Sequence, residues 1–170
     1  ETTRECARLG IKELTLYAFS SENWRRPRAE TLLLMGLLER FLVKERDEIM
    51  ANGIVLRAIG DLARLPARVR REFEKTQAMS ANNGGMILRL ALSYGARQEL
   101  MHAAQGVARY ALAHGQQAVQ QLSEDDLRQF LYDPHMRDPD LLIRTAGEQR
   151  LSNFLLWQLS YAEFFFSPVC

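Results

Sequence analysis

Residues 141–150 have the sequence Leu141-Leu142-Ile143-Arg144-Thr145-Ala146-Gly147-Glu148-Gln149-Arg150, which joins a short apolar run to a basic loop. The apolar run follows the turn-forming Asp-Pro-Asp at 138–140 and predicts a buried parallel strand. Two guanidinium groups, turn amides and the hydroxyl of Ser152 then suit a multiply charged phosphate oxyanion. A surface turn with two solvated arginines is the alternative that this stretch alone leaves open.

The rest of the chain alternates apolar runs with helical patterns. Further strands are predicted over residues 14–19, 54–59, 86–92 and 161–166. Helices are predicted at the start of the chain, over 29–51, from Pro66 to about residue 82, over 96–114 and after Ser123. Strands that are apolar on both faces and are each followed by a helix favour an α/β fold, with a mostly parallel central sheet flanked by helices.

Composition places the chain among ordinary globular proteins, with 47% hydrophobic and 25% charged residues. The 22 Lys and Arg against 21 Asp and Glu leave a net charge of +1, so no overall basic field favours nucleic acid as a partner. No apolar run reaches the roughly 18–20 residues that a membrane span needs, and we expect neither a membrane span nor a signal peptide.

Both ends of the sequence predict a chain that has been cut. Glu1 is not an initiator methionine, and the sequence stops at Cys170, shortly after the apolar run 164–166. We therefore expect residues 1–170 to form a single, incomplete domain. The two cysteines, Cys6 and Cys170, match no metal motif and no disulfide framework, which is typical of the reducing cytosol.

Polar, turn-forming segments come directly after the predicted strands. They occupy residues 20–28, 60–64, 93–97 and 145–150. In open α/β sheets, ligands bind beyond the carboxyl ends of the strands, so this placement predicts one shared crevice.

The segment after the first predicted strand combines hydroxyl, amide, carboxylate, indole and guanidinium side chains. Its sequence is Phe19-Ser20-Ser21-Glu22-Asn23-Trp24-Arg25-Arg26-Pro27. Its amide and hydroxyls can position a diphosphate or a proton, and its arginines can neutralise developing negative charge. Trp24 is explained equally well as an anchor in the core.

Five segments, taken together and in order, resemble the cis-prenyltransferases, the undecaprenyl diphosphate synthase family. They are the 19–27 segment, Ile59-Gly60-Asp61, Tyr94-Gly95, the run from Arg144 to Phe154, and Trp157-Gln158-x-x-Tyr161-x-Glu163. Each segment alone is a weak signal, whereas five in order across essentially the whole chain are specific.

The resemblance implies a transferase that condenses isopentenyl diphosphate onto an allylic diphosphate, usually farnesyl diphosphate. The product would be a cis-polyprenyl diphosphate, such as the undecaprenyl carrier lipid of cell-wall synthesis. By matching position, the implied substrate-binding residues are Ser20, Glu22, Trp24, Arg26, Arg144, Arg150 and Ser152. Asn23 and Arg26 would be catalytic, with Asn23 positioning the proton lost from isopentenyl diphosphate, and Glu163 would bind the Mg²⁺ cofactor.

The 29–51 segment is apolar around more than one face, which indicates either a helix buried on two sides or the wall of a tunnel for the polyprenyl tail. The tunnel residues implied are Leu34, Leu38, Phe41, Met86 and Leu88. The resemblance also implies a homodimer in the cytoplasm, with peripheral membrane contact through the lipid product.

Some of the family pattern is missing. The amino-terminal segment, with its aspartate motif and the first strand of the sheet, is absent, and so is a Trp-Pro segment near the carboxyl end. Ala146 and Gln149 are smaller departures. A non-catalytic scaffold subunit, or an inactive fragment, therefore remains an alternative. A nucleotide-binding α/β domain is disfavoured, because neither of the usual glycine-rich phosphate loops occurs.

Overall fold

The computed structural model describes residues 1–169, which belong to two compact units, Glu1–Tyr94 and Gly95–Cys170. Cys170 lies outside the described residues. The prediction that Cys6 and Cys170 form no disulfide framework is therefore not tested by the structure. That the two units form one domain stays a prediction. Within residues 1–169, no helix is both long and apolar enough to cross a membrane.

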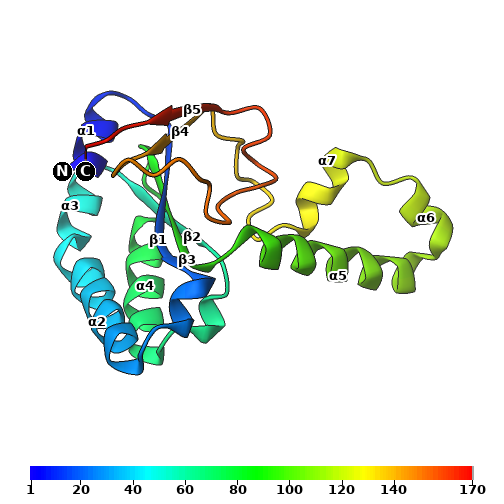
Figure 1. Ribbon diagram of the computed structural model, residues 1–170, viewed down its shortest axis with the longest axis horizontal. Coiled ribbons are helices and arrows are strands. Elements are labelled where there is room, and N and C mark those ends of the chain that lie inside the picture. Colours follow the sequence, from blue (N-terminus) through cyan, green and yellow to red (C-terminus); the bar gives the residue numbers. More distant parts are fainter. Residues whose placement is uncertain (170) are drawn as a thin grey trace. The chain divides into compact units, whose positions relative to one another are not determined.

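The first unit is built on a three-stranded parallel sheet (Figure 1). Its strands are β1 (Glu13–Ser20), β2 (Val55–Ile59) and β3 (Ile87–Tyr94), in the order β1-β3-β2. Leu88 of the central strand β3 pairs with Leu14 on one side and with Leu56 on the other. These strands confirm the apolar runs predicted over 14–19, 54–59 and 86–92, to within two residues at each end.

Four helices belong to the first unit: α1 (Thr2–Arg8), α2 (Arg28–Lys44), α3 (Arg46–Ala51) and α4 (Ala67–Ser80). The single helix predicted over 29–51 is wrong in one respect, because the chain leaves the helix at Glu45 between α2 and α3. The next residue, Arg46, is tied to α4: its Nη2 lies 2.6 Å from Glu72 Oε2, and its Nε donates to Thr76 Oγ1 at 2.9 Å. This tertiary contact is not visible in the local pattern.

The core of the first unit lies where the helices pack on the sheet. Its buried members are Phe19, Met35, Leu42, Ile49, Ile54, Leu56, Leu65, Val69, Phe73, Met86, Leu88, Leu90 and Leu92. Met86 and Leu88, both predicted to line a tunnel, belong to this packed core, and Leu34 and Leu38 pack against it half-buried. Phe41 is 37% exposed. The tunnel therefore stays a prediction.

Arg89 is a charged residue in the middle of β3 and is only 1% exposed. Its Nη1 donates to Glu13 Oε2 at 2.7 Å, which pairs the buried guanidinium with a carboxylate of the neighbouring strand. A buried charge is tolerated only when it is paired in this way.

The second unit contains a parallel pair of strands, β4 (Leu141–Arg144) and β5 (Glu163–Phe166). Its helices are α5 (Ala96–His114), α6 (Gln116–Gln120) and α7 (Glu124–Leu127). The predicted bounds of α5 are confirmed, α6 was not predicted, and β5 begins two residues later than expected. Ser123 caps α7 as predicted, and its backbone N–H, donating to Asp126 Oδ2 at 2.8 Å, lowers the pKa of that carboxyl.

The α/β class and the parallel pairing of the strands are confirmed, but the described strands form two sheets rather than one. The prediction of a buried strand at 141–143 is wrong for the described chain: Leu141 is 50% and Ile143 59% exposed. The physical reason is that both strands of a two-stranded sheet are edges, with little neighbouring structure to cover them.

Candidate functional site

The carboxyl ends of β1, β2 and β3 meet at one edge of the first unit's sheet, because the three strands are parallel (Figure 1). Ser20 at the end of β1 pairs with Tyr94 at the end of β3. After β2, the backbone N–H of Asp61 donates to the carbonyl of Ser93 at 3.3 Å. The polar segments after these three strands therefore lie at one edge of the sheet, and the shared crevice stays a prediction.

The segment after β1 is a short 3-10 turn, η1 (Ser21–Arg25). The amide oxygen of Asn23 accepts the backbone N–H of Ser20 at 2.8 Å, which fixes the side chain and identifies its oxygen. The amide nitrogen of Asn23 has no protein partner within residues 1–169 and can donate two hydrogen bonds. This orientation suits a group that donates to a substrate oxygen.

The charged residues of the same segment are exposed. Ser21 Oγ donates to Glu22 Oε2 at 3.1 Å, and Arg26 forms a loose ion pair with Glu30, at 3.6 Å. Such solvent-exposed pairs contribute little to stability. Arg26 is therefore free to exchange its carboxylate partner for a more highly charged anion.

Trp24 lies half-buried against the core, with its ring edge-on to Phe19 at 4.9 Å between centroids. Its Nε1–H donates to Ser93 Oγ at 2.9 Å, and the guanidinium carbon of Arg64 lies 5.0 Å from the ring centroid. Trp24 is thus both a core contact and part of the edge at which the three strands end.

The basic loop of the second unit follows β4. Its turn is formed by two left-handed residues, Ala146 (φ 63°) and Gly147 (φ 68°). Their backbone N–H groups donate to the carbonyls of Val169 (3.2 Å) and Ser167 (2.9 Å). The expectation that the turn amides bind an oxyanion is therefore wrong for these two amides, because the segment after β5 extends the pairing of the strands and uses them.

Glu148 lies between the two predicted diphosphate arginines. Its Oε2 is 2.5 Å from Arg150 Nη1 and 4.0 Å from Arg144 Nη2. The carboxylate thus pairs closely with Arg150, and Arg144 lies at the outer limit of an ion pair with it. The cluster of Arg144, Glu148 and Arg150 carries a net positive charge, and Arg150, with 68% of its side chain exposed, faces solvent.

Ser152 and Asn153 are two consecutive residues of the second unit with an unusual backbone. Both are left-handed, with φ of 51° and 62°. The carbonyl of Asn153 accepts the N–H of Ala96 at 2.8 Å, and its Oδ1 accepts the N–H of Arg97 at 2.9 Å. Asn153 therefore caps the start of α5 from a distant part of the chain, and this cap holds the backbone next to Ser152.

Replacing Asn153 with alanine is expected to lower the free energy of unfolding by about 1–2 kcal/mol, because the cap of α5 is lost and alanine disfavours a left-handed backbone. Urea unfolding and hydrogen exchange of the Arg97 amide measure the effect. Asn153→Asp keeps the acceptor and is the matched control, with most of the stability retained. Unchanged exchange at Arg97 in Asn153→Ala would show that the cap does not form in solution.

Glu163, the predicted metal ligand, is exposed at the start of β5, and its backbone N–H donates to the carbonyl of Asp140 at 2.9 Å. Among residues 1–169, no three His, Cys, Asp or Glu side chains come together as a metal site. Mg²⁺ commonly binds one or two carboxylates together with substrate phosphates, so a single exposed carboxylate fits an ion shared with a diphosphate.

Comparison with known proteins decides the family. A family model described as "Putative undecaprenyl diphosphate synthase" matches residues 1–170. The chain belongs to this prenyltransferase family. Its resemblance to cis-prenyltransferases, predicted from five short segments, is thereby confirmed.

Curated relatives in the prenyltransferase family are similar along almost the whole chain. The isoprenyl transferase of Geobacter sulfurreducens is 48% identical over 165 residues, which cover 97% of this chain and 67% of the relative. That of Bacillus subtilis is 45% identical over 168 residues, covering 99% and 64%. The chain thus spans about two thirds of the length of these relatives.

Two solved structures of similar proteins also match. A probable undecaprenyl diphosphate synthase from Campylobacter jejuni has a TM-score of 0.85 at 40% identity, covering 98% of this chain and 75% of the other. Lavandulyl diphosphate synthase from Lavandula x intermedia, in complex with dimethylallyl diphosphate, has a TM-score of 0.93 at 37% identity, covering 98% and 72%.

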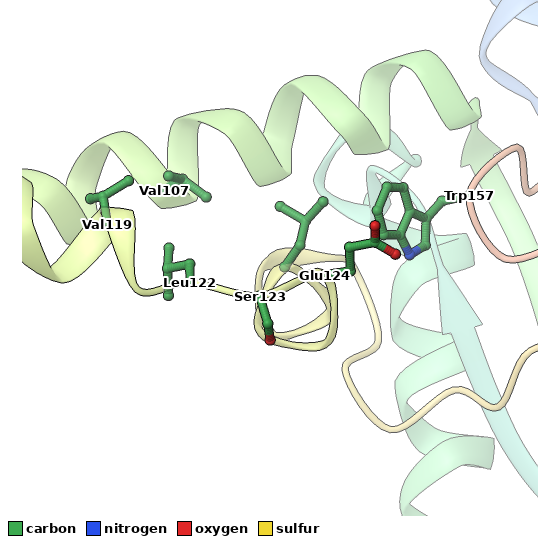
Figure 2. Close-up of a pocket in the computed structure, with 7 residues that line it drawn as sticks. Val107, Val119, Leu122, Ser123, Glu124 and Trp157 are labelled. Atoms are coloured by element: carbon green, nitrogen blue, oxygen red, sulfur yellow. The ribbon is translucent and has the colours of Figure 1, made fainter.

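The prenyltransferase chain also has an apolar pocket that the sequence did not predict, of about 310 Å³ (Figure 2). It is lined by Val107, Val119, Leu122, Ser123, Glu124, Leu127 and Trp157. None of these is a predicted site residue. Sequence reasoning also missed Ser93, Arg64 and Asn153. The only available signal for the first two was their place directly after predicted strands.

Proposed function

We propose that the protein containing this chain condenses isopentenyl diphosphate onto an allylic diphosphate, with farnesyl diphosphate as the expected primer, to make a cis-polyprenyl diphosphate. The observation that carries the proposal is the family match over residues 1–170, which includes the paired arginines around Glu148. The similar lavandulyl diphosphate synthase, solved with dimethylallyl diphosphate, supports an allylic diphosphate as one substrate.

In the proposed reaction, the carbon–oxygen bond of the allylic diphosphate breaks and diphosphate leaves. The terminal double bond of isopentenyl diphosphate forms the new carbon–carbon bond, and a proton passes from the neighbouring carbon to the released diphosphate or to water as the cis double bond forms. Both substrates carry a diphosphate, and the diphosphate that leaves gains further negative charge. Cationic side chains of this chain therefore suit the reaction.

Arg144, Arg150 and Ser152 would bind the diphosphate of isopentenyl diphosphate. Without substrate, Glu148 pairs closely with Arg150 and only loosely with Arg144, so both guanidinium groups could exchange it for the more highly charged diphosphate. Arginine suits this role because its planar fork donates two parallel hydrogen bonds to phosphate oxygens.

Ser20, Glu22, Asn23, Trp24 and Arg26 would line the reacting region at the carboxyl edge of the first unit's sheet. Because one lone pair of the Asn23 oxygen already accepts the N–H of Ser20, its amide nitrogen would orient a substrate oxygen beside the departing proton. Arg26 would exchange Glu30 for the leaving diphosphate.

Glu163 would hold Mg²⁺ against a substrate diphosphate, and the ion would offset the charge of that group. The proposal also includes a tunnel for the growing tail beside α2, a cytoplasmic homodimer, membrane contact through the lipid product, and a role in supplying the cell-wall carrier lipid. The family description supports the carrier lipid by naming undecaprenyl diphosphate.

The test is to express the complete gene product and incubate it with labelled isopentenyl diphosphate, farnesyl diphosphate and Mg²⁺. Elongated polyprenyl diphosphate is expected, and its formation should stop when the allylic primer is omitted or EDTA is added. Failure to elongate the primer would contradict the proposal and favour the scaffold alternative. Retention of both arginines argues against that alternative at present.

A further inference from the structure

Trp24 is held from two sides by residues to which the proposed function gives no role. Ser93 accepts the hydrogen bond of the indole N–H at 2.9 Å, and Arg64 lies over the ring at 5.0 Å. The three residues come from the ends of different strands: Trp24 follows β1, Arg64 follows β2 and Ser93 belongs to β3.

The backbone of Ser93 is unusual for a buried residue at the end of a strand. It is only 4% exposed and has a left-handed φ of 51°, which residues other than glycine, asparagine and aspartate rarely adopt. Unfavourable backbone conformations of this kind persist only where the surroundings fix them, and they concentrate at functional sites. Here the carbonyl of Ser93 accepts a hydrogen bond from the backbone N–H of Asp61. The hydroxyl of Ser93 accepts one from the indole N–H of Trp24.

Arg64 supplies the second contact with the indole. It ends a short 3-10 turn, Leu62–Arg64, and it is exposed. Its side chain forms no ion pair within the described part of the chain, and its guanidinium lies instead over the ring of Trp24. A guanidinium over an indole face is attracted by the electron-rich ring and also fixes the plane of that ring.

We propose that Ser93 and Arg64 are positioning residues that fix the indole of Trp24 and thereby orient the allylic substrate beside it. The inference rests on the proposed function, because that function places Trp24 in the reacting region. The hydrogen bond at the N–H and the guanidinium over the face both restrict movement of the indole, which then presents one apolar surface to the substrate.

Purely structural contacts would behave differently. If Trp24 only anchored the core through Phe19, loss of either neighbour would lower stability without changing one substrate's KM more than the other's. To separate these cases, the KM values of the two substrates must be compared and the indole N–H must be observed directly.

The experiment uses the complete gene product and the variants Ser93→Ala, Ser93→Gly, Arg64→Ala and Arg64→Lys. The indole N–H of Trp24 is observed by NMR with ¹⁵N-labelled tryptophan and assigned by its absence in Trp24→Phe. Both Ser93 variants lack the hydroxyl, but only glycine relieves the left-handed backbone. They therefore separate the hydrogen bond from the strain. Exposed Arg109→Ala is the matched control for loss of an arginine.

The expected result is at least tenfold faster solvent exchange of the Trp24 N–H in both Ser93 variants. The KM for farnesyl diphosphate should rise five- to tenfold in the Ser93 variants and in Arg64→Ala. The KM for isopentenyl diphosphate should stay within about twofold of the wild-type value. Arg64→Lys, which keeps the charge but not the planar group, should lie between Arg64→Ala and the wild type.

Unchanged exchange of the N–H in both Ser93 variants would overturn the inference. Faster exchange with wild-type kinetics would also overturn it, since the indole would then be held without orienting a substrate. Absence of prenyl transfer by the wild-type protein would instead contradict the proposed function, and the NMR measurement would still decide whether Ser93 holds the indole.

Discussion

Gly60→Ala is expected to lower the free energy of unfolding by about 2–6 kcal/mol. Gly60 has a φ of 117°, and a Cβ built on it would lie 2.1 Å from the carbonyl oxygen of Leu92 and 3.2 Å from Tyr94 Cα. The disfavoured backbone conformation costs about 1–3 kcal/mol. The overlap with β3 costs about the same again. Relaxation is restricted because the obstructing atoms are backbone of the central strand β3, which is paired on both sides.

Gly115→Ala is the matched control for this prediction. Gly115 also has a positive φ, of 86°, but a Cβ there would meet no atom within 4 Å. Only the backbone cost is then expected, so Gly115→Ala should be clearly less destabilising than Gly60→Ala. Urea unfolding followed by circular dichroism measures both. Equal losses in the two variants would show that β2 and β3 do not approach as closely as the structure indicates.

Arg144→Ala and Arg150→Ala are each expected to raise the KM for isopentenyl diphosphate at least about tenfold in the complete gene product. The physical reason is that a hydrogen bond to a charged group contributes about 1.5–3 kcal/mol, and about 1.4 kcal/mol corresponds to a factor of ten. Steady-state kinetics at saturating farnesyl diphosphate would measure the change.

Two further variants sharpen the test of the arginine pair. Arg150→Lys should recover only part of the affinity, because an ammonium lacks the planar fork that binds two phosphate oxygens. Arg109→Ala, on the exposed side of α5, should leave the KM unchanged. If Arg144→Ala and Arg150→Ala both retain wild-type kinetics, the diphosphate of isopentenyl diphosphate is bound elsewhere.

Much of the fold could be predicted because its signals are local. The strand β3 is apolar at most of its positions, Arg89 being the main exception, and α5 begins and ends where the predicted bounds place it. The break at Glu45 could not be predicted in the same way, because Arg46 is held by Glu72 and Thr76 on another helix. The burial of Arg89 likewise depends on Glu13, 76 positions away in the chain.

The candidate site shows the same difference between features with a local signal and features that depend on distant residues. Arg144 and Arg150 could be proposed from the sequence, because arginine spacing and the family pattern lie within one short segment. Their link through Glu148 became visible only in the structure. The turn amides at 146 and 147, expected to bind an anion, are used by carbonyls at 167 and 169, about 20 residues further along the chain.

The amino-acid order by itself determined the family, the alternation of strands and helices, and the residue types offered for diphosphate binding, because these depend on neighbours along the chain. The three-dimensional structure alone decided how some of those groups are held: Trp24 against Ser93 and Arg64, and the backbone next to Ser152 by the Asn153 cap of α5. Each such contact joins residues 40 or more positions apart, and no local pattern of charge or hydrophobicity records which distant partner folding brings into reach.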